Sequence, residues 1–179
     1  MARLAEPTTW VAFLRAINVG GRNVTMADLR QVFTDAGHDG VESHIASGNI
    51  VFRAAPDQRE EQLEVAIEAQ VQAALGYEVL TFLRRPSELV GIADAAFAGL
   101  SGSHQVGLLK RAPAPDARAA VMALATDNDV IEVVDREVHW RRHDPSASRL
   151  ANGNLERALG MPATFRTVNT LRKIAGKWG

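Results

Sequence analysis

The order of secondary-structure segments in the first half of the chain is the feature that most constrains its fold. Residues 9–17 are almost continuously apolar around Trp10, a pattern typical of a central strand. The segments that follow predict a helix, two strands, a helix and a strand, over 26–36, 41–45, 50–53, 58–75 and 77–83. This is the split βαβ order of ferredoxin-like folds. We therefore expect an α+β protein whose N-terminal subdomain has this arrangement.

The signals at both ends of the first helix support this prediction. Thr25 and Asp28 form a Thr-x-x-Asp pair that resembles a capping box, in which each residue binds the backbone N–H of the other. Apolar residues then recur at helical spacing from Met26 onward, and Gly37 supplies a stop. The pattern predicts an amphipathic helix between these two signals.

The second half of the chain repeats the first in outline. A stretch rich in glycine and serine over 99–103 predicts a linker, so that the expected subdomains are 1–98 and 99–179. A strand, a helix and a hairpin of two strands are predicted beyond it, over 105–110, 116–125, 130–134 and 137–142. Two helices close the chain, over 148–159 and 169–177, with 160–164 as their connection. The second subdomain is thus expected to be a related α+β unit with C-terminal helices.

Two turns that contain glycine are candidates for a ligand site. Residues 14–22 lead from the first strand into the first helix, and residues 47–49 join the second and third strands. In a split βαβ sheet the first two strands run in the same direction, so these turns lie at the same end. Glycines allow close backbone approach, helix starts attract anions, and an arginine completes a phosphate or carboxylate clamp. The candidate ligand-binding residues are Arg15, Asn18, Gly20, Gly21, Arg22, Ser47, Gly48 and Asn49.

A purely structural interpretation of the same residues stays open. Glycines turn the chain, and Asn18 and Asn49 can form hydrogen bonds within their own loops. The glycine pattern matches neither the dinucleotide-binding fingerprint nor the phosphate-binding loop that ends in Gly-Lys-Ser/Thr. The position of a site is therefore better indicated than its chemistry.

The charge distribution raises the question of an acidic partner. From residue 141 to the end the chain carries eight basic and two acidic side chains, although the whole chain has a net charge of -1. Such a segment favours a nucleic acid, a nucleotide or another phosphorylated ligand, and the chain's own acidic part is the alternative. The absence of cysteine and of long apolar runs predicts a soluble cytoplasmic protein without a membrane partner. Homo-oligomerisation stays open.

Three histidines and one tryptophan are candidates for catalysis, metal binding or nucleic-acid binding. His139 and His143 lie about 13 Å apart on an extended strand, too far to share one ion, and we predict neither a metal site nor a cofactor. His44 adjoins Ser47 and could serve it as a general base, but no partner carboxylate is apparent. Trp140 precedes two arginines, which is typical of a surface for nucleic acid; a half-buried tryptophan explains the pattern equally well.

Several motifs together carry a family resemblance. Leu-Arg-Ala-Ile-Asn-Val-Gly-Gly from Leu14, Ser-Gly-Asn-Ile-Val-Phe from Ser47, and a Thr-Phe-Arg-Thr-Val-Asn-Thr segment over 164–170 occur in this order. The chain resembles the domain of unknown function (DUF) family 1697, which implies a two-part α+β fold and no established activity. Ala16 stands where the family pattern has glycine, and Thr167-Val168 replaces Asn-Trp. Arg166 and Asn169 are shared with the pattern, which makes them candidate ligand-binding residues.

Three functional hypotheses follow from these observations. The first is a binding module for a phosphate-bearing ligand, a nucleotide or a nucleic acid, at the glycine-rich loop and the Ser-Gly-Asn turn. The second is an enzyme that acts on a small phosphorylated or carboxylated substrate, which Arg15, Asn18, Ser47 and Asn49 would polarise. The third is a structural or interaction protein in which these residues serve only turns and helix caps.

Overall fold

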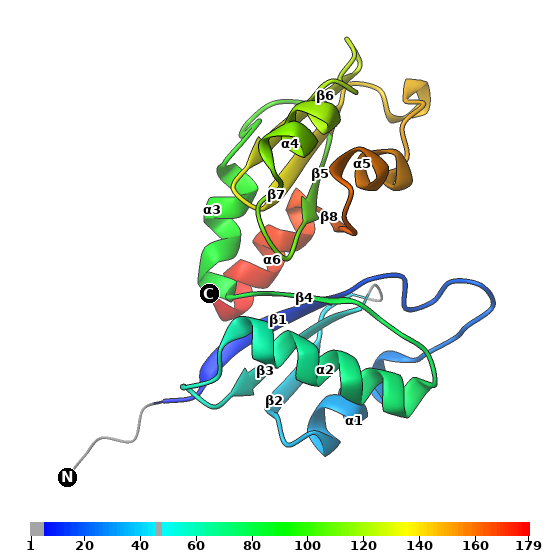
Figure 1. Cartoon of the computed structure of the whole chain (residues 1–179). Helices are drawn as coiled ribbons and strands as arrows, with labels where there is room; N and C mark the ends of the chain where they lie inside the picture. The colour runs from blue at the N-terminus through cyan, green and yellow to red at the C-terminus, as the bar shows by residue number, and fades with distance from the viewer. Residues whose placement is uncertain (1–5, 46–47) are drawn as a thin grey trace. The chain divides into compact units, whose positions relative to one another are not determined.

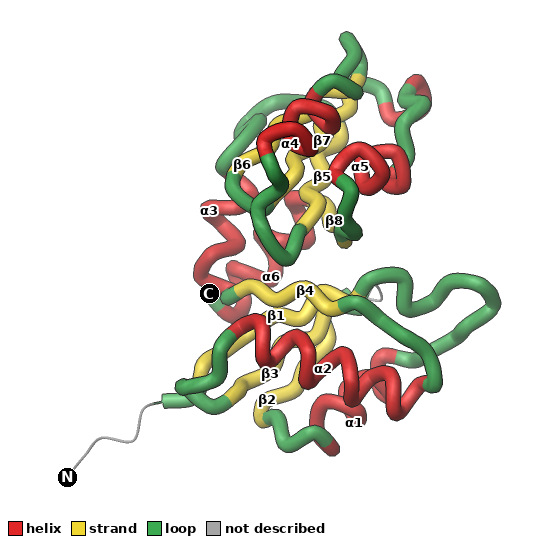
Figure 2. Tube along the Cα trace, viewed as in Figure 1, coloured by secondary structure: helices red, strands yellow, loops and turns green. Residues whose placement is uncertain are grey.

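The computed structural model describes residues 6–45 and 48–179. The fold is α+β, with two four-stranded antiparallel sheets (Figures 1 and 2). The chain forms two compact units, the first extending to Pro86 and the second spanning Ser87–Lys177. No helix in the described residues has both the length and the apolar composition needed to cross a membrane.

The first unit has the strand order that its sequence predicts. Its elements are β1 (Thr8–Leu14), α1 (Met26–Asp35), β2 (Asp39–Ser43), β3 (Asn49–Ala54), α2 (Glu60–Leu75) and β4 (Thr81–Arg84). The sheet runs β2-β3-β1-β4, and every neighbouring pair of strands is antiparallel. β3 therefore lies between β1 and β2, which run in the same direction. Figure 1 shows α1 and α2 on one side of this sheet.

The core of the first unit explains the continuous apolar pattern of β1. Trp10, Ala12 and Leu14 alternate onto one face, where they pack in a cluster with Leu29 and Phe33 of α1 and with apolar residues of α2. The residues between them on β1 are buried as well. A strand that is buried on both faces has no solvent-facing positions for polar residues, so its sequence does not alternate between apolar and polar residues.

The predicted capping box is present at the start of α1. The backbone N–H of Asp28 donates to Thr25 Oγ1 at 3.0 Å, and the N–H of Thr25 donates to Asp28 Oδ2 at 3.4 Å. These bonds satisfy N–H groups that the first helical turn leaves without a partner. The helix accordingly begins at Met26, as predicted.

The second unit repeats the topology of the first. The boundary between the units falls within a 3-10 turn (Pro86–Glu88), and a second such turn (Pro145–Ala147) follows β7 of the second unit. Its other elements are α3 (Leu89–Asp94), β5 (Ser103–Leu108), α4 (Pro115–Met122), β6 (Asp129–Val134), β7 (Glu137–Arg142), α5 (Asn152–Leu159), β8 (Thr164–Thr167) and α6 (Val168–Trp178). The sheet order β6-β7-β5-β8 matches β2-β3-β1-β4 strand for strand. The second α+β unit is therefore related to the first in structure.

Strand β8 is the element that the sequence did not predict. Residues 160–164 were expected only to connect two helices, whereas residues 164–167 pair antiparallel with β5, from Leu108 opposite Thr164 to Gln105 opposite Thr167. The strand has four residues, and only Thr164 is fully buried. So short a segment shows no periodicity, and it becomes a strand because the edge of β5 is available to it.

The interpretation of Trp140 as part of a nucleic-acid surface was wrong. Its ring is 1% exposed and belongs to the core of the second unit. The indole N–H donates to Asp129 Oδ1 at 2.9 Å, and the Ser148 hydroxyl donates to the same oxygen. Burial with its polar atom satisfied explains the tryptophan as a core residue.

Candidate functional site

The two turns singled out from the sequence do lie together. The backbone N–H of Leu14 donates to the carbonyl oxygen of Gly48 at 2.9 Å. A Cβ on Gly48 would lie 3.4 Å from the side chain of Ile17, so the loop after β1 packs closely on this turn. Ser47 lies outside the described residues, and with it the suggested pairing to His44.

The asparagines of these turns form hydrogen bonds within the fold. Asn18 closes its own loop: its Oδ1 accepts from the N–H of Val24 at 2.8 Å and its Nδ2 donates to the Val24 carbonyl at 3.3 Å. Asn49 is fully buried, and its Nδ2 donates to the carbonyl of His44 at 2.9 Å. These contacts agree with the interpretation in which both asparagines stabilise their own turns, and a ligand role for Asn18 and Asn49 stays a prediction.

The rest of the glycine-rich loop combines one anchored arginine with open backbone. The guanidinium of Arg22 lies 3.8 Å from the centre of the Tyr77 ring, and the Tyr77 hydroxyl donates to the carbonyl of Ile17. Gly20 and Gly21 have φ values of 68° and 81°, and no atom would meet a Cβ at either position. The N–H of Arg15 donates to the Leu80 carbonyl. A ligand role likewise stays a prediction for Arg15, Gly20, Gly21 and Arg22.

A polar cavity of about 370 Å³ lies in the second unit, where no sequence motif pointed to it as a whole. It is bounded by the connection between α3 and β5, by the start of β5 and by the start of α6. Phe97 and Leu100 supply apolar lining, and polar lining comes from Ser103, His104, Thr167, Asn169 and Arg172. Of the predicted site residues, Asn169 lines this cavity.

The start of α6 explains how Asn169 is presented. The Thr167 hydroxyl accepts from the N–H of Thr170 at 3.2 Å and so caps the helix. Asn169 lies in the exposed first turn, and its side chain forms no hydrogen bond with the described residues. Its amide is therefore available to a ligand in the cavity.

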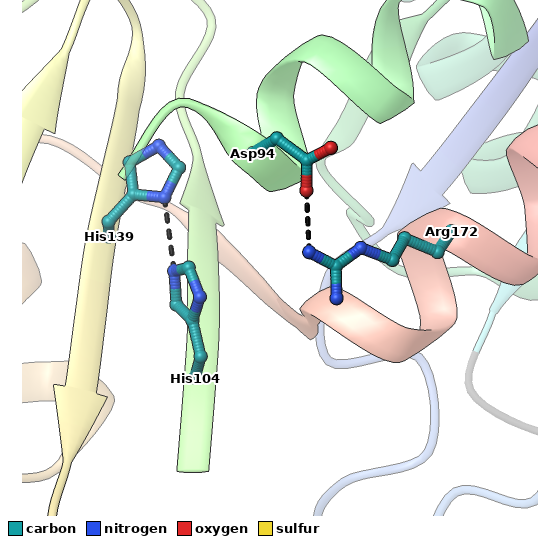
Figure 3. A network of polar contacts seen from close by, with 4 residues as sticks. All are labelled: Asp94, His104, His139 and Arg172. Atoms are coloured by element: carbon teal, nitrogen blue, oxygen red, sulfur yellow. Dashed lines mark hydrogen bonds and ion pairs between the residues drawn. The ribbon is translucent and has the colours of Figure 1, made fainter. Parts of the chain in front are cut away.

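Arg172 is held at the cavity by a carboxylate. Its Nη2 donates to Asp94 Oδ1 of α3 at 2.5 Å, and both side chains are a little under half exposed (Figure 3). An exposed ion pair of this kind adds little to stability. It does fix the direction of the guanidinium, which otherwise has many rotamers.

The cavity has a positive electrostatic environment at His104. Burial, followed by the charges of Arg172 and Arg141, lowers the pKa of His104 to about 4. Arg141 is itself mostly buried, and its Nε donates to the carbonyl of Ser101 at 2.7 Å. Burial disfavours a charge of either sign, whereas the charges of the two arginines disfavour a proton on the imidazole and attract an anion.

His104 also contacts a second histidine. Its Nε2 lies 3.1 Å from Nδ1 of His139, which is fully buried on β7 (Figure 3). Burial, followed by the proximity of His104, lowers the pKa of His139 to about 4, so both rings are neutral near pH 7. No group of three or more ligating side chains suited to a metal ion is found among the described residues.

Arg166, the other C-terminal candidate, supports the strand that precedes α6. Its Nη1 donates to Thr164 Oγ1 at 2.8 Å and to the carbonyl of Phe165 at 2.9 Å. Burial lowers the pKa of this guanidinium to about 10, which leaves it charged at neutral pH. Arg166 does not line the cavity, its hydrogen bonds to Thr164 and Phe165 support β8, and a ligand role for it stays a prediction.

Sequence reasoning missed His104, His139 and Arg172 as a group. His139 was considered only with His143 on its own strand, whereas its partner is on β5, where Val106 and not His104 is directly opposite. Arg172 and Asp94 are 78 residues apart. The pairing register of β5 and β7 brings the two histidines together, and no local sequence motif signals that register.

The chain is thus an α+β protein of two units with equal strand order, the second of which contains a polar cavity. It belongs to the family of proteins of unknown function DUF1697, whose model matches residues 8–139. Its fold is similar to that of the conserved bacterial protein SP0830 from Streptococcus pneumoniae, with a TM-score of 0.74 and 22% sequence identity. That similarity covers 97% of this chain and 99% of the other. A comparison with curated proteins finds no match.

Proposed function

We propose that the protein is a binding module for a small ligand that carries a phosphate or carboxylate group, and that the cavity of the second unit holds this group. The observation that carries the proposal is the position of Arg172, beside a neutral histidine and an available amide, in the wall of one cavity. An arginine and neutral donors together suit an oxyanion. The cavity volume of about 370 Å³ falls within the range of small-molecule sites.

A small ligand is favoured over a nucleic acid. Binding to single strands uses exposed aromatic rings along a basic groove. Trp140, the ring next to Arg141 and Arg142, is buried in the core, and it offers no face for a base to stack on. The cavity volume of about 370 Å³ suits a small phosphorylated molecule rather than an extended single strand of nucleic acid.

The first experiment measures affinity for inorganic phosphate, acetate and adenosine monophosphate by isothermal titration calorimetry. Wild-type protein is expected to bind at least one of these anions. Arg172→Ala is expected to weaken that binding by about tenfold to a hundredfold, because a charge-assisted hydrogen bond contributes about 1.5–3 kcal/mol. Arg149→Ala is the matched control, since it removes an exposed arginine of the same unit that does not line the cavity.

Two results would contradict the proposal. Equal loss of affinity in Arg172→Ala and Arg149→Ala would show a general charge effect without a site. Loss of affinity in Asn18→Ala, with wild-type affinity in Arg172→Ala, would place the ligand at the turns of the first unit instead. A short oligonucleotide that bound more tightly than the small anions, with strong salt dependence, would favour a nucleic-acid partner.

A further inference from the structure

The contact between His104 and His139 has a consequence for the chemistry of the cavity. Both rings are neutral near pH 7, because burial holds the pKa of each at about 4. A neutral imidazole has one nitrogen that donates and one that accepts. In a contact of 3.1 Å between His104 Nε2 and His139 Nδ1, one ring must therefore donate and the other accept. The direction of this bond fixes which nitrogen of His104 carries the proton.

The surroundings of His139 distinguish the two directions. Its Nε2 is buried and has no hydrogen-bond partner among the described residues. If His104 donated, His139 would carry its proton on that Nε2, which would be a buried N–H without an acceptor. If His139 donates from Nδ1, its Nε2 keeps only a lone pair there. Buried N–H groups without partners are rarer in proteins than buried acceptors without partners, so the second direction is favoured.

The other nitrogen of His104, Nδ1, is the one that can contact a ligand in the cavity. Figure 3 shows Nδ1 of His104 on the side of the ring that faces Arg172. The guanidinium of Arg172 donates to Asp94 and forms no hydrogen bond with His104. The protonation of His104 Nδ1 is therefore determined by the contact with His139 rather than by Arg172.

We propose that His139 fixes His104 in the form that carries its proton on Nδ1, so that the cavity presents a permanent N–H donor beside Arg172. His139 is a positioning residue in this scheme, and His104 contacts the ligand. The ligand class follows, and this part rests on the proposed function. The cavity selects an oxyanion with at least two acceptor oxygens, one for Arg172 and one for the neutral N–H of His104.

The tautomer of His104 can be measured without any ligand. Long-range ¹H–¹⁵N NMR spectra of the free full-length protein near pH 7 report which imidazole nitrogen is protonated. We expect His104 to be protonated at Nδ1 in the wild type. In His139→Leu, where the donor is gone, His104 is expected to lose this fixed form and carry its proton mainly on Nε2. A wild-type His104 protonated at Nε2 would overturn the proposal, whatever binds in the cavity.

The affinity of the same variants tests the consequence for the ligand. His139→Leu is expected to bind inorganic phosphate about fivefold to tenfold more weakly than the wild type, which corresponds to one neutral hydrogen bond. His38→Leu is the control, because it replaces a partly buried histidine that packs against Phe33 and Phe52 of the first unit and does not line the cavity. It should lower stability and leave the affinity unchanged.

Failure of this inference and failure of the proposed function give different results. Unchanged phosphate affinity in His139→Leu, while Arg172→Ala still loses affinity, would overturn the role of His139 and leave the anion site standing. Absence of binding of phosphate and of acetate to the wild type would overturn the anion site and the ligand class together. Acetate binding without phosphate binding would identify the oxyanion as a carboxylate and support the inference with that narrower class.

Discussion

Among the described residues of the first unit, Ala16 and Ile45 are the residues other than glycine that have a left-handed backbone, and Ala16 lies in the glycine-rich loop. Its φ of 54° lies in the left-handed region, which costs a residue with a Cβ roughly 1–2 kcal/mol relative to glycine-like freedom. The family pattern that the chain resembles has glycine at this position. The structure thus gives that glycine a conformational reason, and it explains why a loop with alanine in its place carries strain.

Replacing Ala16 with glycine should stabilise the protein. Ala16→Gly removes the clash of the Cβ and adds freedom to the unfolded chain, so the expected net gain in the free energy of unfolding is about 0.5–1 kcal/mol. Urea denaturation measures it. Ala69→Gly, at an exposed position inside α2, should have the opposite sign and cost about 1 kcal/mol. A loss of stability in both variants would show that Ala16 is not strained.

The buried histidine pair should make the protein less stable in mild acid. An unfolded histidine has a pKa of about 6.5, whereas burial holds the pKa of His104 and of His139 at about 4. Between these values the unfolded chain binds more protons, so stability is full above about pH 6.5 and is lost as the pH falls toward 4. The loss for the pair is on the order of several kcal/mol, since each pKa is lowered by more than two units and one unit corresponds to about 1.4 kcal/mol.

Thermal unfolding at a series of pH values checks this prediction. His139→Leu removes one of the two groups, so its stability should fall less steeply than that of the wild type between pH 6.5 and 4. Parallel curves for the two proteins over this range would contradict a role for the pair. Burial raises the pKa of Asp129, but hydrogen bonds from Ser148, Trp140, Asn128 and Thr126 outweigh it and lower the pKa overall, so this carboxylate contributes at lower pH.

At the scale of elements, carboxylates of α2 complete the hydrogen bonding of edge strand β4. The N–H of Leu83 donates to Glu64 Oε1 at 3.0 Å, and the N–H of Thr81 donates to Glu68 Oε1 at 2.8 Å. In the second unit Glu156 of α5 accepts from the N–H of Ala163, the residue before β8, at 2.8 Å. The helix that precedes the last strand of each sheet, α2 or α5, thus bonds the backbone at or next to that strand.

Removing one of these carboxylates should destabilise the first unit. Glu64 is 4% exposed, so Glu64→Ala leaves the N–H of Leu83 without its acceptor, at an expected cost of about 1–3 kcal/mol. Glu64→Gln keeps an acceptor oxygen and should cost less. Denaturant unfolding gives both values. Glu61→Ala, at an exposed position of the same helix, is the control, and an equal loss there would contradict the specific role of Glu64.

At the scale of the whole molecule, the sequence predicted the architecture better than the cavity. The order of segments determined the sheet of the first unit, because split βαβ units leave few ways to arrange the strands. The capping pair Thr25 and Asp28 was readable because its spacing is local. The cavity depends on Asp94, His104, His139 and Arg172, which meet only through the register of β5 and β7 and the placement of α3 and α6. Those contacts carry no local signature in the chain.

The carboxylates that bond the backbone of β4 also bear on how separate molecules behave toward each other. The outer strand of a sheet normally presents free amides that a strand from another molecule can join. At β4 the amides of Thr81 and Leu83 are already used, so a second chain would have to displace Glu64 and Glu68 before it could extend the sheet. The same two side chains therefore protect this edge against aggregation for as long as they stay in place.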